Sequence, residues 1–174
     1  MPRTEEPTIR PRDPSDLPTL IQILTDVHIL TNYPVDGPST FSAKLQSPNA
    51  LISIVALYNG KLAGHAQLQP ASVLNSAITE SLSSHGAPIT SFATLVSLFV
   101  DPKIQGKGVG ARLVEEAVAW GKKEGRRLVL VVLEKDAAAI RMYERMGWVR
   151  GVEYFYESIQ GVDYRAFSYL APEV

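Results

Sequence analysis

Cysteine is absent from this sequence of 174 residues. Its absence excludes disulfide bridges, thiolate metal sites and cysteine nucleophiles, and it fits a reducing compartment. A net charge of either sign is nearly absent too, because 17 basic residues stand against 18 acidic ones. Such a balance provides no general field that would attract nucleic acid or an anionic membrane. We therefore predict that neither is a partner of this protein.

Long hydrophobic runs are also lacking. The longest, such as Leu128–Leu133, are far too short to span a bilayer. The N-terminal segment MPRTEEPTIRPRDP has no apolar stretch that could form the core of a signal peptide. Hydrophobic residues still make up 45% of the chain, which is enough for an ordinary globular core. We expect a single cytoplasmic domain over residues 1–174, without a metal site.

The first half of the chain predicts a strand, a helix and a hairpin. Leucines recur at helical spacing after Pro14. Further along, two β-rich runs flank Asn59-Gly60, a pair that favours the positive φ angles of a type I′ turn. The predicted elements are a strand over Thr8–Arg12, a helix from about Pro14, a weaker helical stretch over Phe41–Gln46, and hairpin strands over Leu51–Tyr58 and Lys61–Gln69.

The second half alternates strands and helices. It follows Pro70–Ser91, a segment of weak pattern that predicts a long loop with room for a short helix. The order of elements predicts an α/β (α+β) fold, in which helices pack on a mixed sheet. The predicted elements are strands over Phe92–Val100 and Leu128–Leu133, a helix from the glycine turn to about Glu124, a helix that Asp136 caps and Gly147 ends, and a hairpin over Glu153–Ile159 and Asp163–Leu170.

A glycine-rich turn joins a predicted strand to a predicted helix. The segment Asp101–Ala111 reads DPKIQGKGVGA. A helix N-terminus leaves backbone N–H groups without partners and carries roughly half a positive charge, so it stabilises an anion. Glycines let the backbone approach that anion closely, and successive N–H groups then form a nest suited to a pyrophosphate. Lys107 and Arg112 add positive charge at the rim.

Several functions are compatible with an isolated turn of this kind. It can be a plain strand-to-helix turn without a ligand. Gly106–Ala111 also satisfies the dinucleotide fingerprint G-x-G-x-x-A, with Glu134 following a strand downstream, which would indicate a nicotinamide-dependent oxidoreductase. The spacer Asp101–Gln105 argues against that fingerprint, which normally starts directly at the strand end. A P-loop is excluded because the chain has no Gly-Lys-Ser/Thr triplet.

The turn and two neighbouring segments together resemble one known family. Gln105–Gly110 resembles the Q/R-x-x-G-x-G/A signature of the GCN5-related N-acetyltransferase (GNAT) family. Leu98–Pro102 resembles the strand and proline that precede this signature. Asp136–Trp148 is similar to the family's N-x-x-A-x-x-x-Y-x-x-x-G-F segment, with Asp136 in place of Asn and Trp148 in place of Phe. The order of elements also matches, so the resemblance covers nearly the whole chain.

The resemblance implies a fold and a cofactor. The fold is a mixed, mostly antiparallel central sheet with a parallel, splayed strand pair, flanked by helices. The cofactor is acetyl-CoA as acetyl donor, whose pantetheine arm pairs with strand backbone like an added strand. Tyr143 lies at the position of the tyrosine that protonates the leaving thiolate. The residues implied to bind the cofactor are Leu98, Phe99, Val100, Gln105, Gly106, Lys107, Gly108, Val109, Gly110, Ala111, Asp136 and Tyr143.

The sequence says less about the acetyl acceptor than about the acetyl donor. The resemblance implies transfer of the acetyl group to a small-molecule primary amine or a peptide amino group. The substrate-contacting candidates are Tyr33, His65 and Tyr154, while Asp36 and Glu153 are carboxylates that could attract an ammonium group. Phe92–Val100 has no carboxylate to act as general base, which leaves His65, His28 or bulk water. A non-catalytic acyl-CoA-binding module stays an alternative, and the resemblance allows a homodimer.

Overall fold

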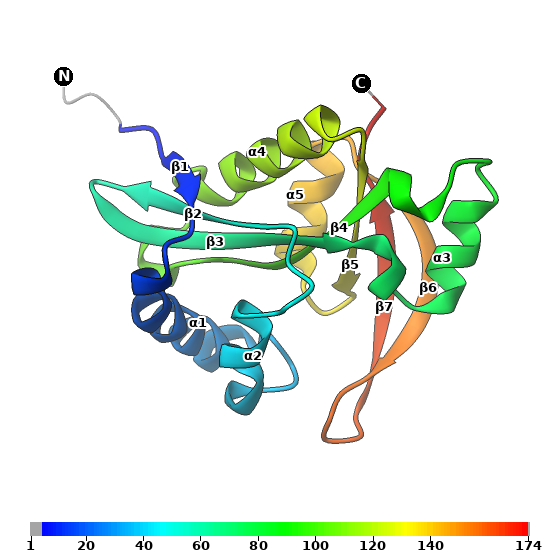
Figure 1. Cartoon of the computed structure of the whole chain (residues 1–174). Coiled ribbons are helices and arrows are strands. Elements are labelled where there is room, and N and C mark those ends of the chain that lie inside the picture. Colours follow the sequence, from blue (N-terminus) through cyan, green and yellow to red (C-terminus); the bar gives the residue numbers. More distant parts are fainter. Residues whose placement is uncertain (1–4, 174) are drawn as a thin grey trace. The chain divides into compact units, whose positions relative to one another are not determined.

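The computed structural model describes residues 5–173. It contains a seven-stranded sheet in the order β1-β2-β3-β4-β5-β7-β6, together with helices (Figure 1). This mixed, mostly antiparallel sheet with flanking helices confirms the predicted fold class. None of the helices among these residues is long and apolar enough to cross a membrane. The strands are β1 Thr8–Pro11, β2 Ile52–Tyr58, β3 Lys61–Pro70, β4 Phe92–Val100, β5 Arg127–Leu133, β6 Val149–Glu157 and β7 Asp163–Leu170, and the helices are α1 Leu17–Thr31, α2 Phe41–Leu45, α3 Ser76–Ser83, α4 Val109–Lys123 and α5 Ala137–Arg145.

The chain forms two compact units, which we describe separately. The first unit comprises the chain up to Gln67 together with Ser97–Ala117. The second comprises Leu68–Val96 and the chain from Val118 on. Strands β3 and β4 and helix α4 each pass from one unit to the other. The single domain over residues 1–174 therefore stays a prediction.

In the first unit, α1 and α2 lie together on one side of β2 and β3 (Figure 1). Their apolar side chains form a core with Val55 of β2 and Phe99 of β4. A 3₁₀ turn over Pro14–Asp16 precedes α1, and Asp13 caps this turn, since its carboxylate accepts the backbone N–H of Ser15 at 2.9 Å. The β2–β3 hairpin has the predicted turn, because Asn59 and Gly60 both adopt positive φ angles of 52° and 74°.

In the second unit, the start of β4 pairs in parallel with β5. Phe92–Leu95 pairs with Arg127–Leu130. On its other side β5 pairs antiparallel with β7, which in turn pairs with β6. Helix α3 lies within the predicted loop over Pro70–Ser91, and its Ile78 and Leu82 join a second core with Phe92 and Val129.

The C-terminal hairpin is longer than predicted. Its first strand, β6, begins at Val149 rather than at Glu153, and the register with β7 shifts between Arg150 and Glu153. A bulge of this kind breaks the alternation of apolar and polar residues on which the sequence-based boundary relied. The predicted stops were correct elsewhere, since Gly125 and Gly147 follow α4 and α5 with φ angles of 68° and 87°.

We predict that Gly121→Ala destabilises the protein, although alanine is ordinarily about 1 kcal/mol better than glycine inside a helix. A Cβ at Gly121 would lie 2.6 Å from the carbonyl oxygen of Arg126 and 2.9 Å from Cδ2 of Leu128. Overpacking of this kind costs about 1–3 kcal/mol. Thermal unfolding should therefore show a lower Tm. Lys123→Ala, an exposed change in the same last turn of α4, is the control and should leave Tm nearly unchanged.

Candidate functional site

The glycine turn forms an open, exposed cradle of backbone. It begins with a short 3₁₀ helix over Pro102–Ile104, capped by Asp101, whose carboxylate accepts the N–H of Lys103 at 3.0 Å. Gly106 and Gly108 then adopt φ angles of 82° and 78°, a conformation that other residues rarely reach. A Cβ added at either glycine would meet no atom within 4 Å. The space beside both glycines is therefore open to a ligand.

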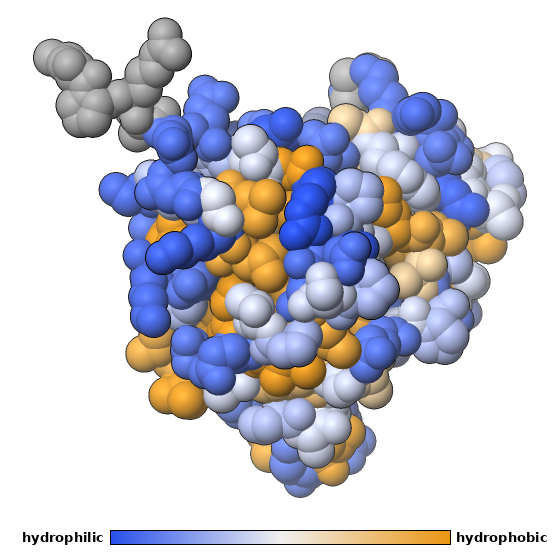
Figure 2. Space-filling view, turned by 60° about the vertical axis from the view of Figure 1, so that its left-hand side comes forward, coloured by the Kyte–Doolittle hydropathy of each residue, from blue (hydrophilic) through white to orange (hydrophobic). Residues whose placement is uncertain are grey.

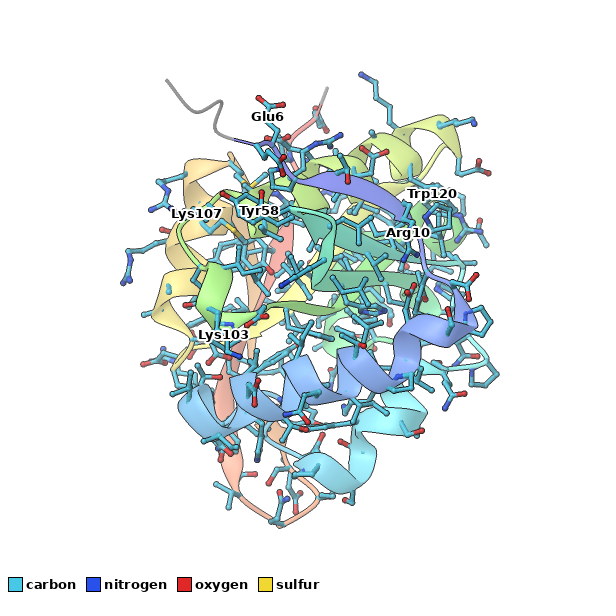
Figure 3. All side chains as sticks on the ribbon, turned by 90° about the vertical axis from the view of Figure 1, so that its left-hand side faces the viewer. Glu6, Arg10, Tyr58, Lys103, Lys107 and Trp120 are labelled. Atoms are coloured by element: carbon cyan, nitrogen blue, oxygen red, sulfur yellow. The ribbon has the colours of Figure 1, made fainter. Side chains whose placement is uncertain are left out.

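Helix α4 begins directly after this cradle. Its first main-chain hydrogen bond joins the N–H of Arg112 to the carbonyl of Gly108 at 3.0 Å. The N–H groups of Val109–Ala111 precede that bond, so they have no acceptor within the helix. They supply the positive end of the helix dipole next to the two glycines. Lys107 is exposed between those glycines, and Figure 3 shows it on the same loop as Lys103. The turn can hold an anion of pyrophosphate size.

Strand β3 contacts Phe99 near the end of β4 and Asp101, the residue that follows β4. The N–H of Asp101 donates to the carbonyl of Ala63 at 2.7 Å. A Cβ at Gly64 would lie 2.8 Å from the carbonyl oxygen of Phe99, so the two strands approach closely there. Because successive strand residues direct their polar groups to opposite sides, the backbone groups of Leu98 and Val100 point away from β3. These backbone groups can therefore pair with an extended chain that lies on the side of β4 away from β3.

His65 of β3 is fully buried beside these residues. Its Nδ1 lies 2.9 Å from the carbonyl oxygen of Ser97. Because a carbonyl only accepts, Nδ1 carries the proton of the neutral ring and Nε2 is the acceptor. The ring stacks on Phe99 at 5.3 Å between centroids, and Nε2 is buried without a hydrogen-bond partner. In this conformation His65 offers no exposed surface to a substrate.

Burial also controls the protonation of His65. It lowers the pKa of the imidazole from 6.5 to about 4. The hydrogen bond to Ser97 raises this pKa, whereas the positive charge of Arg12 lowers it further. The ring is therefore neutral near pH 7.

Ser97 has a conformation that the sequence does not signal. It has a φ of 51° in the middle of β4, in the left-handed region that favours glycine. It lies two residues after Leu95, the last β4 residue that pairs in parallel with β5. A serine in a run of β-forming residues predicts ordinary strand geometry, so only the tertiary structure reveals this interruption.

Tyr143 belongs to the second unit, on the buried side of α5. The side chain is 6% exposed, and its ring lies 5.7 Å from that of Trp148 and 6.5 Å from that of Tyr169. The hydroxyl of Tyr169 donates to Glu144 at 2.7 Å and accepts from Arg150 at 2.9 Å. These bonds tie α5 to β6 and β7, and so they hold the helix that carries Tyr143.

Asp136 stands at the predicted helix start but does not cap it with its side chain. It is the N-cap residue of α5, and its carbonyl accepts the N–H of Ile140 at 3.1 Å. Its carboxylate makes no capping hydrogen bond and instead pairs with Nζ of Lys135 at 2.8 Å. The predicted N-cap position is therefore correct, whereas the side-chain capping hydrogen bond is absent and the carboxylate pairs with the neighbouring cation instead.

The predicted acceptor-side residues are divided between the two units. Tyr33 packs against the core of α1 and α2 in the first unit, where His65 also lies. Tyr154 packs against the core that contains Ile78 in the second unit, and burial raises its pKa. Asp36 and Glu153 already have cations of the protein as partners, in Lys44 at 3.5 Å and in Arg165.

Each unit has a shallow surface pocket. In the first unit the pocket has a volume of about 330 Å³ and includes Ile29 and Leu30, which are 74% and 69% exposed. Its lining residues are Asp26, Ile29, Leu30, Asp101, Pro102 and Lys103. The pocket in the second unit, of about 430 Å³, is lined by Glu134, Lys135, Asp163, Tyr164 and Arg165. Figure 2 shows hydrophobic side chains gathered into continuous areas on one face of the surface.

Known proteins resemble this chain in sequence and in fold. The sequence pattern of the acetyltransferase (GNAT) family matches residues 19–148. An uncharacterized N-acetyltransferase of Methanocaldococcus jannaschii is 40% identical over 57 residues, which are 32% of this chain and 25% of that relative. This chain therefore matches about a quarter of the length of that curated relative.

Two solved structures share the fold over most of their length. The ribosomal-protein-S18-alanine N-acetyltransferase from Escherichia coli is 27% identical, with a TM-score of 0.69 over 95% of this chain and 93% of the other. NAA60 of Arabidopsis thaliana in complex with acetyl-CoA is 20% identical, with a TM-score of 0.71 over 94% of this chain and 97% of the other. The second likeness concerns the fold alone.

We predict that His65 makes the stability of the protein sensitive to acid. The unfolded chain takes up the proton near pH 6.5, whereas the folded chain does so only near pH 4. Stability is therefore lost as the pH falls through this range, by about 2 kcal/mol between pH 8 and pH 5. The leucine variant His65→Leu should lack this part of the loss when urea unfolding is measured at both pH values. A control change at the exposed His85, His85→Leu, should keep the wild-type difference.

Proposed function

We propose, on the ground that this chain belongs to the acetyltransferase (GNAT) family, that it transfers the acetyl group of acetyl-CoA to the amine of a small molecule or peptide. The observation that carries the donor assignment is the open glycine cradle at the start of α4. The name of the 27% identical Escherichia coli protein gives an alanine of a ribosomal protein as the acetylated residue. That similarity supports a peptide amino group among the possible acceptors.

The donor is assigned to the turn and to the strand that leads into it. The pyrophosphate lies against the N–H groups of Gly106–Ala111, where the two glycines leave room and the helix dipole is favourable. Gln105 is assigned the role of stabilising the conformation of the turn. Leu98 and Val100 pair with the pantetheine arm through the backbone groups that point away from β3. Phe99 anchors this edge, since its side chain is buried in the core of the first unit.

Acetyl-CoA supplies an activated acyl group as a thioester. The amine must be neutral to attack the thioester carbon; the new C–N bond forms as the C–S bond breaks, and the sulfur leaves as a thiolate. Tyr143 donates its phenolic proton to that thiolate, because a phenol is a weak acid suited to this step. The proton of the amine passes to water, since β4 has no carboxylate and His65 is buried. The phenolate of Tyr143 then regains a proton from water.

Two segments are candidates for contact with the acceptor: the loop after α1 in the first unit, and the C-terminal hairpin in the second unit. Tyr33 and Tyr154 are the candidate contacts, each half-buried with part of its surface open. The pocket beside the end of α1 combines exposed Ile29 and Leu30 with the carboxylate of Asp26. Such a lining suits an ammonium group that is attached to an apolar body.

We predict that Gly108→Asp abolishes or strongly weakens the binding of acetyl-CoA. Aspartate would strain a φ of 78° and place a negative charge where the phosphates bind. Calorimetric titration with acetyl-CoA should show an affinity at least about 100-fold lower, which is the combined effect of steric exclusion and charge repulsion.

The matched control is Gly86→Asp, because Gly86 has a similar φ of 80° and equally open space but lies after α3. This variant has the same strain and the same added charge, and it should bind acetyl-CoA like the wild type. Equal binding by both variants and the wild type would remove the cradle from the donor site.

We predict that Tyr143→Phe lowers kcat by about 100-fold, the lower end of the range for loss of a general acid. The affinity for acetyl-CoA should change much less, because the phenol acts on the leaving thiolate. The measurement is thiol release from acetyl-CoA across a panel of amines and N-terminal peptides. If acetyl-CoA binds but no acceptor in the panel causes thiol release from it, the transferase activity is contradicted. An unchanged kcat would remove Tyr143 from the mechanism.

A further inference from the structure

His65 is a buried titratable group that the proposed chemistry does not use. It has no exposed surface, its pKa is low, and its Nε2 has no partner. A buried imidazole with one unpaired nitrogen is costly, since an apolar residue of similar size would fill the space without that penalty. The hydrogen bond that its Nδ1 makes with Ser97 is therefore the feature that distinguishes histidine from a hydrophobic residue at this position.

The partner of this hydrogen bond is a strained residue. Ser97 adopts a φ of 51°, a left-handed conformation that is strained for a residue with a side chain. In a regular strand the carbonyl lies in the plane of the sheet, whereas the side chain of His65 stands roughly perpendicular to that plane. The two groups meet because the left-handed conformation turns the Ser97 carbonyl out of the plane. The hydrogen bond with His65 therefore stabilises the left-handed conformation of Ser97, and it would be lost if Ser97 adopted an ordinary strand conformation.

The strain lies directly before the edge assigned to the donor. Ser97 immediately precedes Leu98, and its conformation sets the direction in which the backbone of Leu98–Val100 continues. The stacking of His65 on Phe99 holds the middle of the same stretch. Past it, the bond from Asp101 to Ala63 at 2.7 Å fixes the far end. The histidine therefore holds the start and the middle of the strand segment that aims Leu98 and Val100.

We propose that His65 is a positioning residue for acetyl-CoA, which holds Ser97 in its left-handed conformation and thereby aims the pantetheine-binding edge of β4. This assignment rests on the proposed function, because it concerns the strand edge that would bind the donor. It gives the neutral imidazole a role through Ser97, without contact with the substrate.

The test separates the hydrogen bond of His65 from its bulk. His65→Asn keeps an N–H donor near the position of Nδ1, and His65→Leu has nearly the same size without a donor. Titration with acetyl-CoA should show an affinity roughly five- to tenfold lower for the leucine variant, the factor that corresponds to one hydrogen bond. The asparagine variant should stay within about twofold of the wild type. The KM for the acceptor amine should change little in either variant.

A second substitution tests whether the effect passes through Ser97. Glycine adopts a positive φ without support, so Ser97→Gly added to His65→Leu should restore most of the lost acetyl-CoA affinity. It cannot restore the stacking on Phe99, so recovery would exclude simple packing loss. Should His65→Leu fail to fold, Ser97→Val replaces it, because a β-branched residue disfavours the left-handed region and should weaken binding similarly.

Gln67→Leu is the matched control for general destabilisation. Gln67 lies on the same strand, is equally buried, and donates at 3.1 Å to the carbonyl of Leu45 and at 3.1 Å to the hydroxyl of Ser53. This variant should lose stability and keep its affinity for acetyl-CoA. Equal affinities of the leucine and asparagine variants at His65, or a loss in Gln67→Leu as large as in His65→Leu, would overturn the positioning role. A wild-type protein that does not bind acetyl-CoA would refute the proposed function itself.

Discussion

The close approach of β3 to β4 is the constraint on which the first unit depends. It requires glycine at position 64, because a Cβ there would lie 2.8 Å from the Phe99 carbonyl and 3.0 Å from Leu113. The same contact brings the first turns of α4 against the sheet through Val109 and Leu113. The position of the helix N-terminus, and with it the anion-binding cradle, therefore follows from one missing side chain in β3. A tight packing contact determines where the positive end of a helix is presented.

The two parts of the donor site meet opposite physical demands. The cradle must be exposed and free of side chains, since a phosphate is bound by bare N–H groups, and Gln105–Gly108 are all exposed. The strand before the cradle must hold a fixed direction, and the buried side chains of Phe99 and His65 support it. Within the second unit, the hydroxyl of Tyr169 similarly fixes α5 through Glu144. Open backbone and buried support thus lie next to each other along the chain.

Local signals predicted most elements, and they failed where neighbours override local preference. The Asn59-Gly60 turn and the stops at Gly125 and Gly147 were predictable because positive φ angles select glycine and asparagine strongly. The start of β6 was not, because a bulge interrupts its alternation. The side chain of Asp136 was also misplaced, since an ion pair with the adjacent lysine competes with the expected cap.

The order of elements, the glycine cradle and the family resemblance could be predicted from the sequence, because they depend on residues close together in the chain. The roles of residues whose partners are distant in sequence emerged from the three-dimensional structure. A free histidine has a pKa near 6.5, which suits a general base, yet burial lowers the pKa of His65 to about 4. The sequence around Ser97 predicts an ordinary strand residue, yet Ser97 adopts a φ of 51° beside that histidine. Burial and backbone strain arise from contacts between strands, which local patterns do not encode.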